Sequence, residues 1–336
     1  MKTNNYPLNT DNISSKFYKD LNGSDVPLLE IKPLKKKINL EVILFHGASP
    51  YGEEHPAMID LALALSNGGI KVYIPRLPKL TKLEINIEIV DIIAHFYSII
   101  KKKFPNKNIV PAGMSFGGGL LMMAMLKDNV KNILPKSILA YGTYYSLETS
   151  IDFLVSGKIN NNGNEEFVKP NDWGLVVLFH NYLSGIDVGF DSTKMQKVLK
   201  LRVNNKVSES EIEMKKLPEN QIKILENIFQ PNKVPEIIEM TDLIKIAYKD
   251  EIEEISPAKI CNKINYKVFL MHGANDSMVP YTESIKLHEN IPDSFLFLSG
   301  LYEHREILKR NSIIEKVKEL KKMSSFFKEF IDYNVN

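Results

Sequence analysis

The segment that most constrains the fold is residues 108–119, which read NIVPAGMSFGGG. Its first half is short and apolar, as in a buried strand, and its second half consists mainly of small residues, as at the start of a tightly packed helix. The halves meet in the pattern Gly-x-Ser-x-Gly, formed by Gly113, Ser115 and Gly117. Glycine allows a tight turn that a larger side chain would block. The segment therefore predicts a strand, a sharp corner and a helix, with Ser115 at the corner.

Ser115 is a candidate nucleophile because of this position. A serine hydroxyl attacks a carbonyl only when a base can reach it and hydrogen-bond donors can hold the resulting oxyanion. At a strand-to-helix corner the hydroxyl is accessible, and the N–H of Phe116 points to where a carbonyl oxygen would lie. The alternative is an ordinary turn serine at a glycine-rich helix start.

Three further segments give this corner a context. Residues 40–48, LEVILFHGA, form an apolar run that ends in His-Gly-Ala, and residues 266–280 read as a strand followed by a loop with Asp276. Residues 294–306 read as another strand followed by a loop with His304. Serine, acid and histidine thus occur in that chain order. Over residues 38–145 and 256–330 the chain resembles the α/β-hydrolase family, and more loosely its serine esterases and dienelactone-hydrolase-like members.

The resemblance implies a role for each of these residues. Ser115 would be the nucleophile, His304 the general base and Asp276 the acid that orients the base. The N–H groups of Ala48 and Phe116 would form the oxyanion hole. Asp276 could instead be a turn former and His304 a surface histidine. If Asp276 is not the acid, the next candidates are Glu148 and Asp152.

The rest of the chain predicts an α/β fold with a mostly parallel sheet flanked by helices. The expected strands are 40–45, 71–74, 109–112, 136–140, 267–271 and 295–298. The expected helices are 57–66, 85–104, 117–126, 282–289 and 305–333.

Residues 146–255 interrupt this alternation, and we call them the inserted segment. They contain helix-like stretches at 173–183, 208–229 and 235–248 and a polar loop at 160–164. The segment is expected to be a helical cap on a core of residues 1–145 and 256–336, with residues 1–25 as a candidate arm. The alternative is a separate domain or a set of long crossovers.

Substrate contacts are expected from two places. Tyr51 and His55 lie in the long polar loop that follows Ala48, where His55 could line the mouth of a pocket. Trp173 and Phe179 lie in an apolar stretch of the inserted segment, which either lines the pocket or packs the cap against itself. His46 and His272, each before a glycine, are expected to shape loops.

Composition limits the other possibilities. The chain has 336 residues, 44% of them hydrophobic, and a net charge of only +2, so it can bury a large core and does not indicate nucleic-acid binding. The single cysteine, Cys261, excludes an intramolecular disulfide and a thiolate metal site. Neither a secretory signal nor a membrane span is evident. We expect a cytoplasmic enzyme without metal or cofactor; the sequence leaves its oligomeric state open.

The function that this pattern favours is hydrolysis of a small-molecule carboxylic ester through an acyl-enzyme. A peptidase or an acyltransferase could use the same three residues. A binding protein on the same scaffold is a further alternative.

Overall fold

The computed structural model describes residues 12–34, 38–161, 163–230, 234–300 and 313–335. An eight-stranded sheet forms its centre, in the order β1-β2-β4-β3-β5-β6-β9-β10. The strands are β1 (Ile13–Lys19), β2 (Asp25–Ile31), β3 (Glu41–Phe45), β4 (Lys71–Pro75), β5 (Ile109–Met114), β6 (Ser137–Tyr141), β9 (Lys267–Gly273) and β10 (Ser294–Ser299).

Six neighbouring strands of this sheet, from β4 to β10 in the spatial order, are parallel. The two N-terminal strands differ: β2 runs antiparallel to β4, and β1 runs antiparallel to β2. Residues 13–25, which were expected to belong to an arm, are therefore part of a hairpin at one edge of the sheet. The mostly parallel sheet itself is confirmed.

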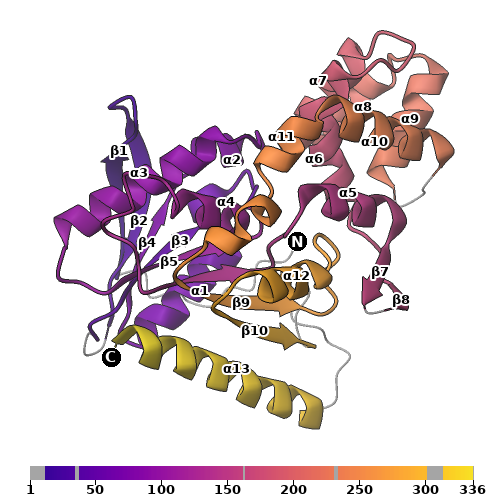
Figure 1. Cartoon of the computed structure of the whole chain (residues 1–336). Helices are drawn as coiled ribbons and strands as arrows, with labels where there is room; N and C mark the ends of the chain where they lie inside the picture. The colour runs from indigo at the N-terminus through magenta and orange to yellow at the C-terminus, as the bar shows by residue number, and fades with distance from the viewer. Residues whose placement is uncertain (1–11, 35–37, 162, 231–233, 301–312, 336) are drawn as a thin grey trace.

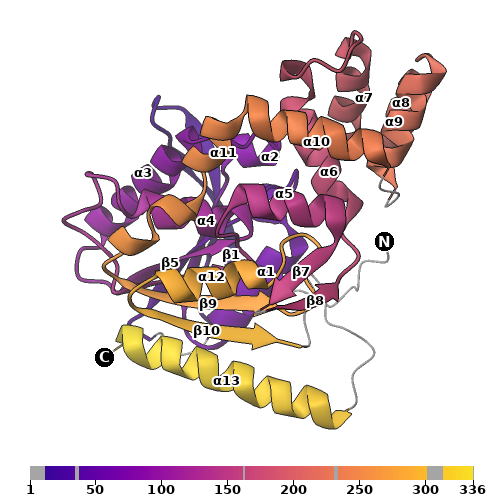
Figure 2. The ribbon, with the colours of Figure 1, turned by 45° about the vertical axis from the view of Figure 1, so that its right-hand side comes forward.

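Helices cover both faces of the sheet. On one face lie α1 (Pro56–Asn67) and α13 (Ile313–Val335), whose buried side chains share a hydrophobic cluster with Val42 and Leu44 of β3. On the other face lie α3 (Glu88–Lys103), α4 (Phe116–Ala124) and α12 (Thr282–Asn290), whose buried side chains belong to the same hydrophobic cluster as Ile43 and Phe45. Figures 1 and 2 both show α13 running below β10.

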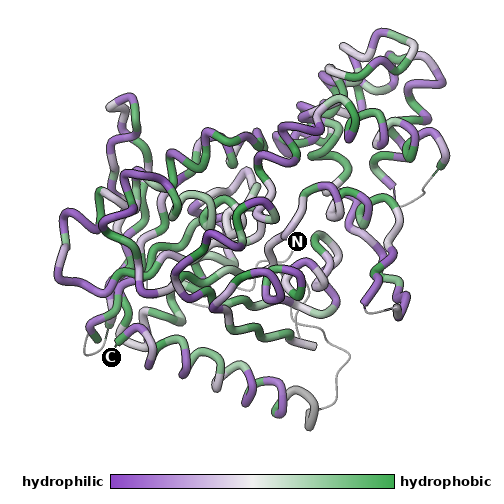
Figure 3. The backbone as a smooth tube through the Cα atoms, in the orientation of Figure 1, coloured by the Kyte–Doolittle hydropathy of each residue, from purple (hydrophilic) through white to green (hydrophobic). Residues whose placement is uncertain are grey.

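The alternation along β3 explains its sequence. Successive side chains of a strand point to opposite faces, so a strand covered on both faces must be apolar throughout. All five residues of β3 are buried, and Figure 3 shows the strands of the sheet as mainly hydrophobic. Glu41 is the polar exception, and it accepts a hydrogen bond of 2.8 Å from the hydroxyl of Tyr73.

The inserted segment leaves the sheet after β6 and ends before β9, and most of it projects to the upper right of Figure 1. Its helices are α5 (Leu147–Ser156), α6 (Asp172–Tyr182), α7 (Thr193–Val203), α8 (Val207–Met214), α9 (Glu219–Phe229), α10 (Pro235–Ala247) and α11 (Lys249–Glu254). Among the described residues, no helix is long and apolar enough to cross a membrane.

Two features of the inserted segment differ from expectation. A small antiparallel hairpin, β7 (Lys158–Asn161) and β8 (Asn164–Phe167), takes the place of the expected polar loop. The stretch 208–229, expected to be helical throughout, contains two helices, because Pro218 precedes α9 and cannot donate a backbone hydrogen bond within a helix.

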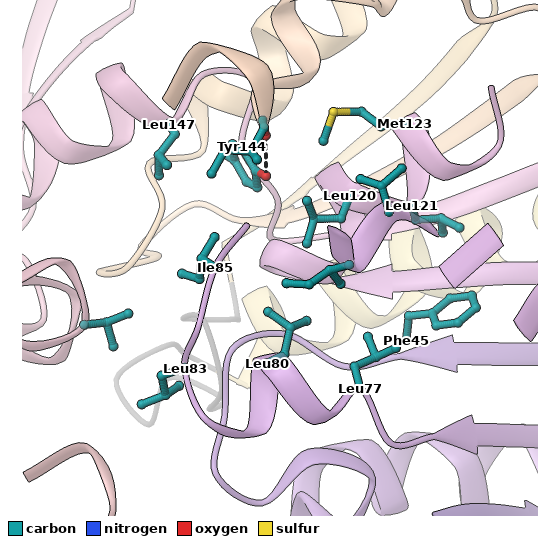
Figure 4. Packing of buried hydrophobic residues seen from close by; sticks show 14 of the residues in the cluster. Phe45, Leu77, Leu80, Leu83, Ile85, Leu120, Leu121, Met123, Tyr144 and Leu147 are labelled. Atoms are coloured by element: carbon teal, nitrogen blue, oxygen red, sulfur yellow. Dashed lines mark hydrogen bonds between the residues drawn. The ribbon is translucent and has the colours of Figure 1, made fainter. Parts of the chain in front are cut away.

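The two ends of the inserted segment lie side by side. The Tyr144 hydroxyl donates a hydrogen bond of 2.7 Å to the Ile255 carbonyl, and Figure 4 shows Tyr144 packed near Leu147 and Leu120. The Leu147 N–H donates to the Ser256 hydroxyl at 3.0 Å. The segment also shares one continuous hydrophobic cluster with helices α3 and α4 of the core.

Candidate active site

Ser115 occupies a strained corner between β5 and α4. Its backbone angles, φ 51° and ψ −126°, lie in a region that residues with a side chain rarely adopt. Three hydrogen bonds hold this conformation. The Ser115 N–H donates to the Tyr141 carbonyl at 2.8 Å, and the Ser115 carbonyl accepts from the Gly118 N–H at 2.9 Å and the Thr143 hydroxyl at 2.8 Å. The surrounding structure thus fixes the side chain that the sequence pattern singled out.

Two glycines let the loop after β3 approach this corner. A methyl group on Gly117 would lie 2.5 Å from the His46 carbonyl oxygen, and one on Gly47 would lie 2.9 Å from the Ser115 Cβ. Both distances are shorter than any ordinary contact, so neither position tolerates a side chain without movement of the backbone. The close approach places Ala48 next to Ser115 on the wall of one cavity.

The two expected oxyanion donors line this cavity together with Ser115. Phe116 is the first residue of α4, so its N–H has no partner within the helix, and no side chain caps it. Within the described part of the chain, neither the Phe116 N–H nor the Ala48 N–H has a protein acceptor. Two backbone donors beside a constrained serine are the arrangement that stabilises an oxyanion.

Asp276 follows β9 and is almost completely buried. One carboxylate oxygen accepts backbone hydrogen bonds from Met278 at 2.8 Å and Val279 at 3.0 Å. The other lies 3.3 Å from Nε2 of the buried His272. Met278 and Val279 line the same cavity as Ser115, so the Asp276 loop borders the site.

His304 lies outside the described residues. The strand that precedes it is placed: Ser299 at the end of β10 pairs with Gly273 at the end of β9. The chain therefore leaves β10 beside the loop that carries Asp276.

The alternative acids are less suited to the role. Asp152 is exposed and forms an ion pair of 2.7 Å with Lys245. Glu148 is exposed in the first turn of α5.

The rival histidines have structural partners, as the sequence predicted for His46 and His272. The His46 ring donates through Nδ1 to the Gly47 carbonyl at 2.8 Å and accepts the Leu77 N–H at Nε2, 2.9 Å away. Burial lowers the pKa of His46 to about 4, so the ring is neutral at pH 7. His272 is fully buried and contacts the Ser284 hydroxyl at 2.7 Å and the Val279 carbonyl at 3.0 Å.

The cavity at Ser115 has a volume of about 70 Å³ and lies between the core and the inserted segment. Among the described residues its wall is formed by Ala48, Ile85, Ser115, Phe116, Tyr144, Leu147, Ser150, Ile151, Leu154, Trp173, Gly174, Val177, Leu178, Asn181, Tyr182, Met278 and Val279. Ile85, Tyr144 and Leu147 are labelled in Figure 4. Trp173 thus lies on the wall, whereas Phe179 is completely buried in the hydrophobic core.

His55 and Tyr51 are placed differently from Trp173. His55 caps α1 by accepting the Ala57 N–H at 3.2 Å, and it lines a second cavity of about 60 Å³ that also borders Ser115 and Ala48. Tyr51 is 53% exposed and lies on the wall of neither cavity.

The described wall of the larger cavity contains no charged side chain. Two of its polar side chains have partners inside the protein: the Ser150 hydroxyl donates to the Ser146 carbonyl, and the Asn181 side chain bonds to the backbone of Leu83 and Ile85. In the described ranges no three His, Cys, Asp or Glu side chains gather where they could hold a metal ion. The cavity is therefore suited to an uncharged apolar group.

Comparison with known proteins gives structural similarity without sequence similarity. No family model and no curated protein matches the chain. A Staphylococcus aureus protein of unknown function is 16% identical, with 93% of this chain and 98% of that chain covered and a TM-score of 0.52. The acylaminoacyl peptidase of Pyrococcus horikoshii is 12% identical, with 95% and 42% covered and a TM-score of 0.52. The proline iminopeptidase of Mycobacterium smegmatis is 8% identical, with 96% and 99% covered and a TM-score of 0.50.

These matches extend over nearly the whole chain, and they agree with the mostly parallel eight-stranded sheet. The protein has the α/β-hydrolase fold. In an α/β-hydrolase, the corner between strand and helix is where a nucleophilic serine is exposed. The fold supports many reactions, so the function has to be inferred from the site.

Proposed function

We propose that this protein is a serine hydrolase that cleaves carboxylic esters with a small apolar acyl or alcohol group. One observation carries the proposal: Ser115, in a strained backbone conformation, opens into an apolar cavity beside two N–H groups that have no protein acceptor. A strained residue beside free backbone donors costs stability, and such an arrangement is typical of a catalytic site.

The proposed reaction proceeds through an acyl-enzyme. His304 takes the proton from the Ser115 hydroxyl as the oxygen attacks the ester carbonyl. Asp276 holds the ring of His304 in the required tautomer and stabilises its positive charge. The N–H groups of Ala48 and Phe116 bind the oxyanion, and His304 returns the proton to the departing alcohol. A water molecule then repeats the sequence and releases the acid.

The cavity favours an ester over a peptide. A peptidase that recognises a chain terminus needs a charged anchor for it, and the described wall has none. The side chains of Ser150 and Asn181, which could otherwise hold a peptide backbone, bond within the protein. An ester requires only the oxyanion donors and apolar contacts. An acyltransferase would use the same site but must keep water from the acyl-enzyme.

The test is the reaction of Ser115 with a fluorophosphonate probe, followed by assays with p-nitrophenyl esters. The wild-type protein should be labelled on the peptide that contains Ser115 and should hydrolyse short esters. Ser115→Ala should abolish labelling and lower kcat by about 10⁴-fold or more, because only the oxyanion hole and binding then remain. Ser156→Ala, which changes a half-buried serine on α5, should behave as the wild type.

Labelling at another serine, or more than a few per cent residual activity in Ser115→Ala, would contradict the proposal. Labelling at Ser115 with cleavage of amides but not esters would keep the nucleophile and replace the substrate class. If a thiol or alcohol acceptor takes the acyl group in preference to water, the protein is an acyltransferase.

A further inference from the structure

The loop that contains Ala48, residues 46–55, is docked on the segment that follows β4, residues 76–81. Besides the bond from the Leu77 N–H to His46, the Ser49 N–H donates to the Leu80 carbonyl at 3.2 Å. A methyl group on Gly52, whose φ is +51°, would lie 2.6 Å from the Thr81 Cγ2. The loop therefore packs against this neighbouring segment with little free space between them.

An ion pair also joins the loop to the segment that follows β4. Arg76 binds Glu53 through two atoms: Nε lies 2.8 Å from one carboxylate oxygen, and Nη2 lies 2.7 Å from the other. The Glu53 side chain is 1% exposed, whereas that of Arg76 is 35% exposed. A carboxylate this deeply buried requires a partner, because an unpaired charge in the interior is strongly destabilising. Without Arg76, the loop that carries Glu53 would have to move until the carboxylate reached water.

Arg76 is itself fixed by the N-terminal hairpin. The backbone N–H of Arg76 donates to the Pro27 carbonyl at 2.9 Å, and the backbone carbonyl of Arg76 accepts a hydrogen bond from the Tyr18 hydroxyl at 2.8 Å. β1 and β2 thus hold the backbone of Arg76, and the Arg76 side chain holds Glu53. The edge hairpin is connected in this way to the loop beside Ser115.

We propose that the Arg76–Glu53 ion pair positions the Ala48 N–H for binding the oxyanion, so that Arg76 is a positioning residue for catalysis. The proposal rests on the proposed function, in which Ala48 is one of two oxyanion donors. A donor stabilises the transition state only if it lies near 3 Å from the oxyanion, and the loss of one donor typically costs about 10²- to 10³-fold in kcat. A displaced Ala48 should forfeit part of that factor.

Arg76→Met removes the guanidinium, and Arg76→Lys keeps a positive charge without the two-atom geometry. The matched control is Lys71→Met. Lys71 begins β4, at the opposite end of the strand from Arg76, and lies 3.2 Å from the buried Glu30. Both methionine variants break an ion pair with a buried carboxylate, although Glu30 keeps Lys16 at 3.0 Å, and only Arg76 contacts the loop with Ala48. The measurements are kcat and KM for a p-nitrophenyl ester, the Ki of a boronic acid that forms a tetrahedral adduct with serine, and Tm.

Arg76→Met should lower kcat by about 10- to 100-fold with KM within about two-fold, because the donor acts in the transition state rather than in the ground state. The boronic acid should bind more weakly by a similar factor. Arg76→Lys should show a smaller loss of the same kind. Lys71→Met should lower Tm while kcat and the boronic acid Ki stay at the wild-type values.

Equal kcat in Arg76→Met and Lys71→Met, at a similar loss of Tm, would overturn the proposal and leave the ion pair a purely structural role. If Arg76→Met does not fold, Arg76→Lys decides by the same two readouts, and unchanged kcat and Ki would again overturn it. A wild-type protein that neither hydrolyses esters nor reacts with the fluorophosphonate would refute the proposed function itself, and the role of Arg76 with it.

Discussion

His46 connects the protonation state of one side chain to the loop beside Ser115. Its Nε2 accepts the Leu77 N–H, which requires an unprotonated nitrogen. Burial, with smaller contributions from His55 and Arg76, lowers the pKa of His46 to about 4. The folded protein therefore favours the neutral form of the His46 side chain over the charged form.

We predict that stability decreases as the pH falls from 6.5 to about 4, in part because of His46. In this window the unfolded chain takes up a proton on His46 that the folded chain does not, so the contribution is complete above pH 6.5 and is lost on acidification. A shift of this size corresponds to roughly 3 kcal/mol. The measurement is the free energy of unfolding in urea across this range, compared with His46→Gln, which retains an acceptor near the Nε2 position.

The comparison separates His46 from the carboxyl groups, which titrate in both proteins. The wild type should lose more stability than His46→Gln between the two pH values. Parallel curves would show that His46 does not contribute, which would mean that its pKa in the folded protein is close to its pKa in the unfolded chain.

At the scale of single residues, the sequence could predict the positions of Ser115 and Asp276 in the fold because their surroundings are local, and their catalytic roles stay predictions. A few neighbouring residues form the corner at Ser115, and Asp276 follows directly after an apolar strand. The pairing of Glu53 with Arg76 could not be predicted in this way. The loop with Glu53 follows β3 and Arg76 follows β4, so the two residues come together only because these strands are neighbours in the sheet. Each residue on its own resembles an ordinary surface charge.

At the scale of elements, the parallel strands could be predicted because burial on both faces makes them continuous apolar runs. The edge strand β1 was missed because six of its seven residues are exposed or half-buried and lysine and serine interrupt it. Asn22-Gly23 between β1 and β2 was an available hairpin signal, and Gly23 has the positive φ typical of such a turn. The Asn-Gly pair at 162–163 was a similar signal for β7 and β8.

We predict that α6 sets the acyl or alcohol length that the cavity accepts. The cavity is about 70 Å³, less than half of an engineered cavity of about 150 Å³ that holds benzene. Trp173→Ala should therefore shift the optimum of kcat/KM from short esters toward longer ones. The measurement is kcat/KM over a series of p-nitrophenyl esters from acetate to octanoate.

Phe179→Ala provides the control on the same helix, since this side chain lies in the core and away from the cavity wall. It should destabilise the protein by about 3–5 kcal/mol and leave the length profile unchanged. A profile that responds to Phe179 and not to Trp173 would contradict this assignment of the wall.

At the scale of the whole molecule, the inserted segment and the sheet share a hydrophobic interior. Ile43 and Leu120 of the core belong to the same buried cluster as Leu178 and Leu199 of the inserted segment. A separate domain would instead have its own core. We therefore predict a single cooperative unfolding transition in spite of the projecting shape seen in Figure 2.

The measurement compares two signals during denaturation in urea. Trp173 is the only tryptophan of the chain, so its fluorescence reports the contact between the inserted segment and the core. Far-ultraviolet circular dichroism reports all helices and strands. The two midpoints should coincide, and a fluorescence change at lower urea would mean that the inserted segment detaches first.

The paired ends of the inserted segment have an evolutionary consequence. The hydrogen bonds from Tyr144 to Ile255 and from Leu147 to Ser256 join the point where the chain leaves the core to the point where it returns. In the topology of the sheet, the inserted segment is therefore one long connection between β6 and β9. Such a unit can be lengthened, shortened or exchanged between lineages by recombination at two adjacent positions, while the corner at Ser115 is inherited unaltered.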